Sequence, residues 1–110
     1  MATRQYTLVV DQGADYTLTI PVLNDSGGAV SVAGWQVAGQ IRSQAAASTV
    51  LAELDVEPDG TSVVLRIPRA VSSAWTFRTA RYDVELTSPD GLNRTRLLEG
   101  LVVLRPEITA

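Results

Sequence analysis

The sequence predicts an all-β fold, an antiparallel β-sandwich of about seven short strands with one short helical turn near residues 69–75. Apolar and polar residues alternate along several short runs, which is the period of a half-buried strand. Clusters of Gly, Pro, Asn and Asp separate these runs at fairly even spacing, a pattern typical of sandwiches and barrels. The 110 residues, 45% of them apolar, suit a single domain spanning residues 1–110.

The first half of the chain contains three of these runs. We expect strands at residues 5–10, 16–23 and 35–42, separated by turns at 11–15 and 24–28. Pro21 cannot donate to a ladder, so the second strand should lie at a sheet edge or carry a bulge. In the third run Trp35, Val37 and Ile41 share one face. We therefore expect a central strand with these three side chains in the core.

The middle of the chain predicts two more strands and the helical turn. A loop of small residues at 43–48, with one helical turn at 45–47, should lead into a strand at 49–54. An acidic turn at 55–60 and a strand at 62–67 follow. Pro68 suits a first helical position, so residues 68–75 should form the helical turn. Val71 and Trp75 would then plug one end of the sandwich.

The last third of the chain predicts a β-hairpin. Three apolar residues alternate with three charged ones along its first strand: Tyr82, Val84 and Leu86 with Arg81, Asp83 and Glu85. A turn signal at 88–91 follows, and a second apolar run ends at Pro106. Tyr82, Val84 and Leu86 are therefore predicted to lie in the core. Asp83 and Glu85 should face outward, and with Trp75 they are the candidate interface residues.

Composition argues against several classes of function. The net charge is −3 and the nine positive residues are scattered, whereas nucleic-acid binding needs clustered cations. Without His or Cys, the usual pairs of nucleophile and base cannot form. No run reaches membrane-spanning length, and no signal peptide is evident. We expect a soluble, cytoplasmically made protein that is not an enzyme and uses no cofactor, nucleic acid or membrane.

Two acidic patterns and the two tryptophans are the candidates for binding or catalytic chemistry. Residues 55–60 imitate the opening of a calcium loop, but Arg66 occupies the twelfth position, where a bidentate glutamate is needed. Asp83 and Glu85 share a face, yet that face should be solvated, so an acid/base pair is disfavoured. We therefore expect no metal site and no catalytic residue. Trp75 could instead stack on a host glycan, whereas the phase of Trp35 places it in the core.

A series of short motifs runs in a fixed order along most of the chain: Asp11-Gln12-Gly13-Ala14-Asp15-Tyr16, Asn24-Asp25-Ser26-Gly27-Gly28, Val32-Ala33-Gly34-Trp35-Gln36-Val37-Ala38-Gly39-Gln40-Ile41-Arg42, Tyr82-Asp83-Val84-Glu85-Leu86, Ser88-Pro89-Asp90-Gly91, Arg96-Leu97-Leu98-Glu99-Gly100 and Arg105-Pro106-Glu107-Ile108-Thr109. Each motif is weak alone, and their order supplies the specificity. In this order the motifs resemble those of a family of small proteins from tailed bacteriophages and prophages.

The resemblance implies an immunoglobulin-like β-sandwich that is a structural component of the virion. Its members are similar to the N-terminal domains of upper baseplate proteins and to tail- or neck-associated proteins. We accordingly expect an adaptor at the tail tip, baseplate or neck, present as a homo-oligomeric ring and bound to other virion structural proteins. The alternatives are a capsid decoration protein and a glycan-binding module of the adsorption apparatus.

Overall fold

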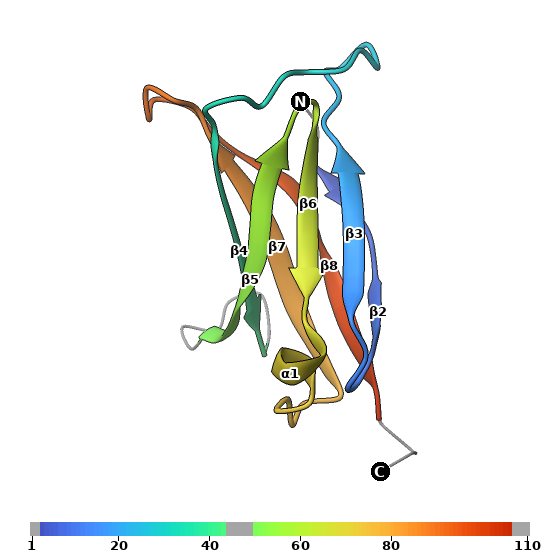
Figure 1. Ribbon diagram of the computed structural model, residues 1–110. Helices are drawn as coiled ribbons and strands as arrows, with labels where there is room; N and C mark the ends of the chain where they lie inside the picture. Colours follow the sequence, from blue (N-terminus) through green and yellow to red (C-terminus); the bar gives the residue numbers. More distant parts are fainter. Residues whose placement is uncertain (1–2, 44–49, 107–110) are drawn as a thin grey trace.

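The computed structural model describes residues 3–43 and 50–106 and confirms an all-β sandwich with one short helix (Figure 1). Its elements, in chain order, are β1 Arg4–Gln5, β2 Leu8–Asp11, β3 Tyr16–Pro21, β4 Gln36–Arg42, β5 Val50–Asp59, β6 Ser62–Ile67, α1 Arg69–Ser72, β7 Thr79–Thr87 and β8 Arg94–Arg105. The loop and helical turn predicted at 43–48 lie almost wholly outside the described residues. No described helix is long and apolar enough to cross a membrane.

The strands form two layers joined by β5. One layer has the order β3–β6–β5, and the other runs from β4 through β7 to β8, where β1 and β2 complete it. Neighbours such as β3 with β6 and β4 with β7 are not consecutive in the chain, which gives the crossing connections of an immunoglobulin-like sandwich. The sequence predicts a wholly antiparallel sandwich. In the structure, β1 and β2 pair with β8 in parallel, and the other strand pairs are antiparallel.

Strand β5 passes from one layer to the other. Its residues 50–54 pair with β4, and residues 55–59 pair with β6. The turn predicted at 55–60 is therefore wrong, because most of that segment is strand. The chain reverses instead at Gly60, whose φ of +62° is the left-handed conformation that glycine adopts without strain. Pro58 is tolerated because the far edge of this half of β5 has no described partner.

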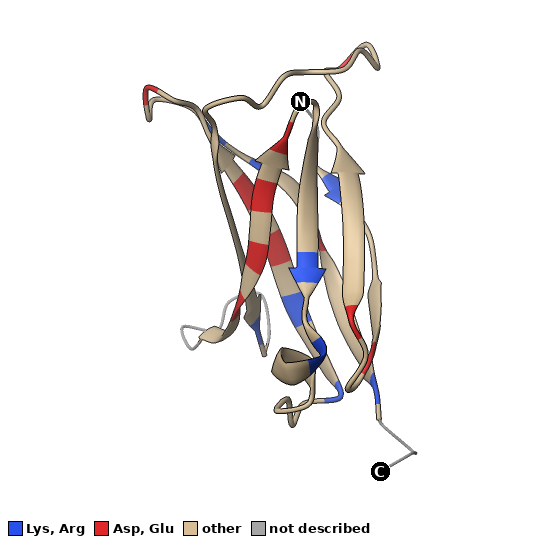
Figure 2. Ribbon diagram, viewed as in Figure 1, with Lys and Arg blue, Asp and Glu red and all other residues tan. Residues whose placement is uncertain are grey.

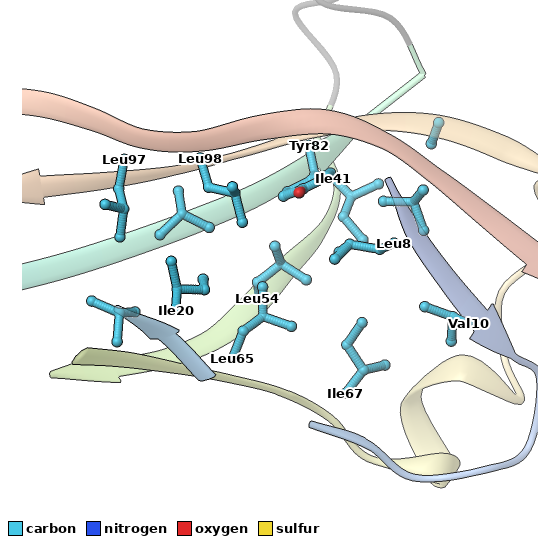
Figure 3. Packing of buried hydrophobic residues seen from close by; sticks show 14 of the residues in the cluster. Leu8, Val10, Ile20, Ile41, Leu54, Leu65, Ile67, Tyr82, Leu97 and Leu98 are labelled. Atoms are coloured by element: carbon cyan, nitrogen blue, oxygen red, sulfur yellow. The ribbon is translucent and has the colours of Figure 1, made fainter. Parts of the chain in front are cut away.

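The core fills the space between the layers with aliphatic side chains and one tyrosine (Figure 3). Ile41, Tyr82, Val84 and Leu86 are buried there, with Leu8, Val10, Leu65 and Ile67 among their companions. Trp35 and Val37, also predicted to lie in the core, are only half-buried and pack against its margin. The physical reason is the departure of β5, which leaves the start of β4 without a covering neighbour.

Three local features differ from the predicted elements. The first strand is interrupted at Tyr6 and Thr7, which separate β1 from β2. The second ends at Pro21 and lies at a sheet edge, as its proline required. In α1 the buried residue is Ser72, whereas Val71 is exposed and does not plug the sandwich.

Candidate interaction surface

A row of polar side chains crosses the outer face of the β4–β7–β8 layer. Strand register places its members directly opposite one another on five successive strands: Glu53, Gln40, Asp83, Glu99 and Gln5. All five positions are outward-facing and none is fully buried. At one end of the row, the side-chain amide of Gln40 donates a hydrogen bond of 3.1 Å to the Glu53 carboxylate. We call these five residues the polar row.

Arg96 lies beside this row and neutralises its acidic centre. Its guanidinium is 3.1 Å from the Glu99 carboxylate, 3.5 Å from Asp83 and 3.9 Å from Glu85. Asp83 and Glu99 stand directly opposite each other, which is destabilising for like charges unless a cation lies between them. Arg94 adds a second contact of 3.9 Å to Glu85. The charges on this face are thus largely compensated within the chain itself.

A bulge in β8 places Arg96 on this face. Val84 pairs with Leu98, but Glu85 pairs with Arg96, so Leu97 has no partner on β7. A β-bulge inserts one extra residue and resets the alternation of faces. Leu97 and Leu98 can therefore both be buried, and Arg96 returns to the outer face beside Asp83 and Glu85.

Burial affects the pKa of Asp83 more than its ion pair with Arg96 does. Partial burial raises the pKa of the Asp83 carboxyl above its ordinary value, and the neighbouring Glu85 charge raises it further. Arg96 and Arg42 act in the opposite direction but do not reverse the shift. Asp83 therefore holds its negative charge less readily than an isolated aspartate does.

Trp75, the third candidate interface residue, lies away from the polar row near α1. Its ring is half-buried against the core and packs on Phe77, with ring centroids 5.0 Å apart. Its main-chain carbonyl accepts a hydrogen bond of 3.1 Å from the Gln12 side chain, which ties this segment to the turn after β2. The structure therefore does not bring Trp75 together with Asp83 and Glu85, and Phe77 occupies part of the surface on which a sugar would stack.

The acidic residues at 55–59 do not form a calcium loop. They lie on β5 at alternate positions of an extended strand, where Glu57 is paired with Arg66. Among residues 3–43 and 50–106, no group of three or more His, Cys, Asp or Glu side chains is placed to hold a metal ion.

Comparison with known proteins gives the family. Residues 2–105 match the family described as an LtfC-like, β-sandwich domain. The chain belongs to this family. The match spans nearly all of the chain, so the LtfC-like domain coincides with the sandwich described above. The polar row and Arg96 are thus features of an LtfC-like domain rather than of a separate appended segment.

The chain was also compared with curated protein sequences and with solved structures. None of the curated protein sequences matches the chain. Among solved structures, the M1 domain from titin is similar over 97% of this chain and 94% of that chain, with 11% identity and a TM-score of 0.46.

Sequence reasoning found Asp83 and Glu85 on the outer face but missed Arg96 and Glu99 as their partners. A regular alternation through β8 would place Leu97, not Arg96, opposite Glu85. The available signal was the adjacent pair Leu97 and Leu98, since one of two neighbouring leucines would be exposed on a strand without a bulge.

Proposed function

We propose that this LtfC-like domain is a non-enzymatic structural component of a tailed-phage particle, where it docks other virion proteins through the outer face of the β4–β7–β8 layer. Membership in the LtfC-like family and the phage-type motifs support the proposal that the domain is part of a phage particle. The single observation that carries the docking face is the cluster of Asp83, Glu85 and Glu99 around Arg96.

This cluster suits a rigid docking surface. A charge that becomes buried without a partner is costly. Here Arg96 lies within 3.9 Å of all three carboxylates, and Arg94 is a second cation at Glu85. The side chains project from paired strands rather than from loops, so they keep their positions when a partner approaches. Charged faces of this kind determine which partner binds and how fast it associates, more than how tightly it binds.

The finer assignment in this proposal is a symmetric ring at the tail tip, baseplate or neck. A domain that repeats around an axis must present its docking face identically in each copy, which a compact sandwich does without rearrangement. Copy number distinguishes this ring from capsid decoration, since decoration needs far more copies per particle. The packing of Phe77 on Trp75 favours docking over glycan stacking.

Incorporation of charge-reversed variants into particles tests the docking face. Arg96→Glu should yield a folded protein that is absent from purified particles, because four carboxylates would then crowd the face. Arg66→Glu is the matched control on the opposite layer. Arg66 is exposed to 44% against 46% for Arg96, and it is likewise surrounded by carboxylates, those of Asp55, Glu57 and Asp59.

The expected result is normal incorporation of Arg66→Glu and loss of Arg96→Glu, with both proteins showing cooperative thermal unfolding. Incorporation of Arg96→Glu at the wild-type level would contradict the docking face. Absence of the wild-type chain from purified particles would contradict the structural role itself.

A further inference from the structure

The start of β4 lies beside an empty strand position. β5 pairs with β4 only as far as Gly39 and Leu54, and from Asp55 onward it pairs with β6 in the other layer. Residues 36–38 keep β7 on one edge, and no described strand pairs with their other edge. Figure 1 shows β5 leaving β4 to join the layer of β6 and β3.

This edge lacks the features that normally protect a strand edge from pairing. Proline, charge, bulges and breaks are the usual devices. Pro21 lies on the edge strand β3, Pro58 lies on the far half of β5, and β1 is broken from β2 at Tyr6. Residues 36–38 are Gln, Val and Ala in regular extended pairing, with no proline, charge or bulge.

An apolar floor adjoins the open edge. A groove of about 780 Å³ runs along β4, and polar side chains of β4, β7 and β8 line most of it. Its apolar part, which we call the floor, is formed by the half-buried Trp35, Val37 and Val56 together with Pro58. An extended segment laid beside β4 would point alternate side chains inward onto this floor. It would thereby bury the surface of Trp35 and Val37 that the departure of β5 leaves uncovered.

The rim of the groove is acidic on the β5 side. β5 carries Glu53, Asp55, Glu57 and Asp59 at alternate outward positions, seen as red bands along the strand in Figure 2. Arg66 faces them from β6 and pairs with Glu57. The charged residues that line the groove itself are two carboxylates, Asp83 and Glu85, and two guanidiniums, Arg42 and Arg94, which balance one another. The excess charge around the groove is therefore the negative charge of the β5 carboxylates. A second copy of the chain pairing β4 with β4 would bring two acidic rims together. Charge complementarity therefore favours a basic occupant.

We propose that residues 36–38 of β4 bind an extended segment of a partner protein, in which apolar residues alternate with Arg or Lys, as an added strand. Main-chain hydrogen bonds to the β4 edge give affinity, and the apolar floor and acidic rim select the side chains. This binding mode goes beyond the proposed docking face, because its main-chain hydrogen bonds form at the edge of β4, although the groove also borders Asp83 and Glu85 of that face.

Two short synthetic peptides test the proposal with the full-length, isotopically labelled protein. One alternates valine with arginine, and the other alternates valine with glutamate. The arginine peptide should bind saturably and slow hydrogen exchange of main-chain amides within residues 36–38, whereas the glutamate peptide should do neither. Ala38→Lys places a cation on an exposed position of this stretch and should weaken binding of the arginine peptide several-fold. Thr19→Lys, the same type of change on edge strand β3, should leave it unchanged.

Three results would overturn the proposal. The first is no saturation by the arginine peptide up to millimolar concentration, and the second is equal binding of both peptides. The third is slowed exchange at residues 36–38 that depends on protein concentration without any peptide, which would identify a second copy as the occupant. Melting curves of Ala38→Lys and Thr19→Lys that match the wild type ensure that a change in binding reports on the edge.

Discussion

The hydroxyl of Tyr82 donates a hydrogen bond of 2.6 Å to the main-chain carbonyl oxygen of Tyr6. Tyr82 is buried in β7 opposite Gly100 of β8, and Tyr6 lies at the break between β1 and β2. The Tyr6 N–H in turn donates to the Glu99 carbonyl over 3.0 Å. Tyr82 therefore fastens the break in the N-terminal strand to the core.

Replacing Tyr82 by phenylalanine should weaken this attachment. Tyr82→Phe removes the donor and keeps the ring, so the loss should be that of one hydrogen bond, about 0.5–1.5 kcal/mol. Denaturant unfolding should show a lower midpoint with an unchanged slope. Tyr6→Phe is the control, because the acceptor is a main-chain carbonyl that this change retains. Equal midpoints for Tyr82→Phe and wild type would refute the role of the bond.

Ionisation of Tyr82 should also lower the free energy of unfolding above about pH 10. Burial, followed by the nearby Tyr16 and Tyr6, raises the pKa of the Tyr82 phenol above its ordinary value of 10.0. Below pH 10 the phenol is protonated in both the folded and the unfolded chain, so Tyr82 contributes fully to the free energy of unfolding. Above it the unfolded chain loses the proton first, so unfolding becomes progressively more favourable.

Tyrosine titration is well isolated here, because the chain has no lysine and no cysteine. The free energy of unfolding of wild type should decline more steeply above pH 10 than that of Tyr82→Phe, as measured by denaturant titration at several pH values. Tyr16, whose pKa burial also raises, contributes equally to both proteins and cancels in the comparison. Parallel declines in the two proteins would contradict this assignment.

Gly100 permits the close approach of the N-terminal segment. A Cβ at this position would lie 2.3 Å from the Tyr6 carbonyl oxygen and 3.1 Å from its carbon, both main-chain atoms that cannot rotate away. Gly100→Ala should therefore displace β1 and cost at least about 1–3 kcal/mol, the usual range for overpacking. Hydrogen exchange of the Tyr6 amide should accelerate as well.

Gly91→Ala separates crowding from backbone conformation. Gly91 has a φ of +77°, and a Cβ there would meet nothing within 4 Å. Its substitution should cost about 1–2 kcal/mol from conformation alone and leave Tyr6 exchange unchanged. Wild-type exchange at Tyr6 in Gly100→Ala would rule out the predicted clash.

Leu86 and Trp35 should differ in their importance for stability. Leu86 is fully buried between the layers, so Leu86→Ala should cost about 2–5 kcal/mol through lost burial and a cavity. Trp35 is half-buried at the margin, so Trp35→Ala should cost less than the roughly 3–5 kcal/mol typical of a buried tryptophan. Thermal or denaturant unfolding that finds Trp35→Ala the more damaging would place Trp35 in the core after all.

The fold was largely predictable because alternation and turn residues determine strands locally. The hairpin of β7 and β8 and the strand Ser62–Ile67 follow directly from such patterns. The crossing of β5 between layers did not, since Asp55, Glu57 and Pro58 have turn-like composition and become strand only through pairing with β6. Tertiary pairing there overrides local preference, and it also leaves Trp35 half-exposed.

The interaction surface was predictable only in part. Asp83 and Glu85 follow from simple alternation along β7, whereas Arg96 reaches them through a bulge that depends on burying both Leu97 and Leu98. The open edge at residues 36–38 arises from the path of a different strand, so no local pattern around Trp35 could reveal it.

Labelling of carboxylates in purified phage particles tests the central proposal, docking through the outer face, most directly. A carboxylate-reactive reagent applied to the free protein should modify Asp83, Glu85 and Glu99, which are all partly exposed. In intact particles the docking proposal predicts strong protection of these three residues, quantified by mass spectrometry of the digested chain. Modification of all three in particles to the same extent as in the free protein would contradict it.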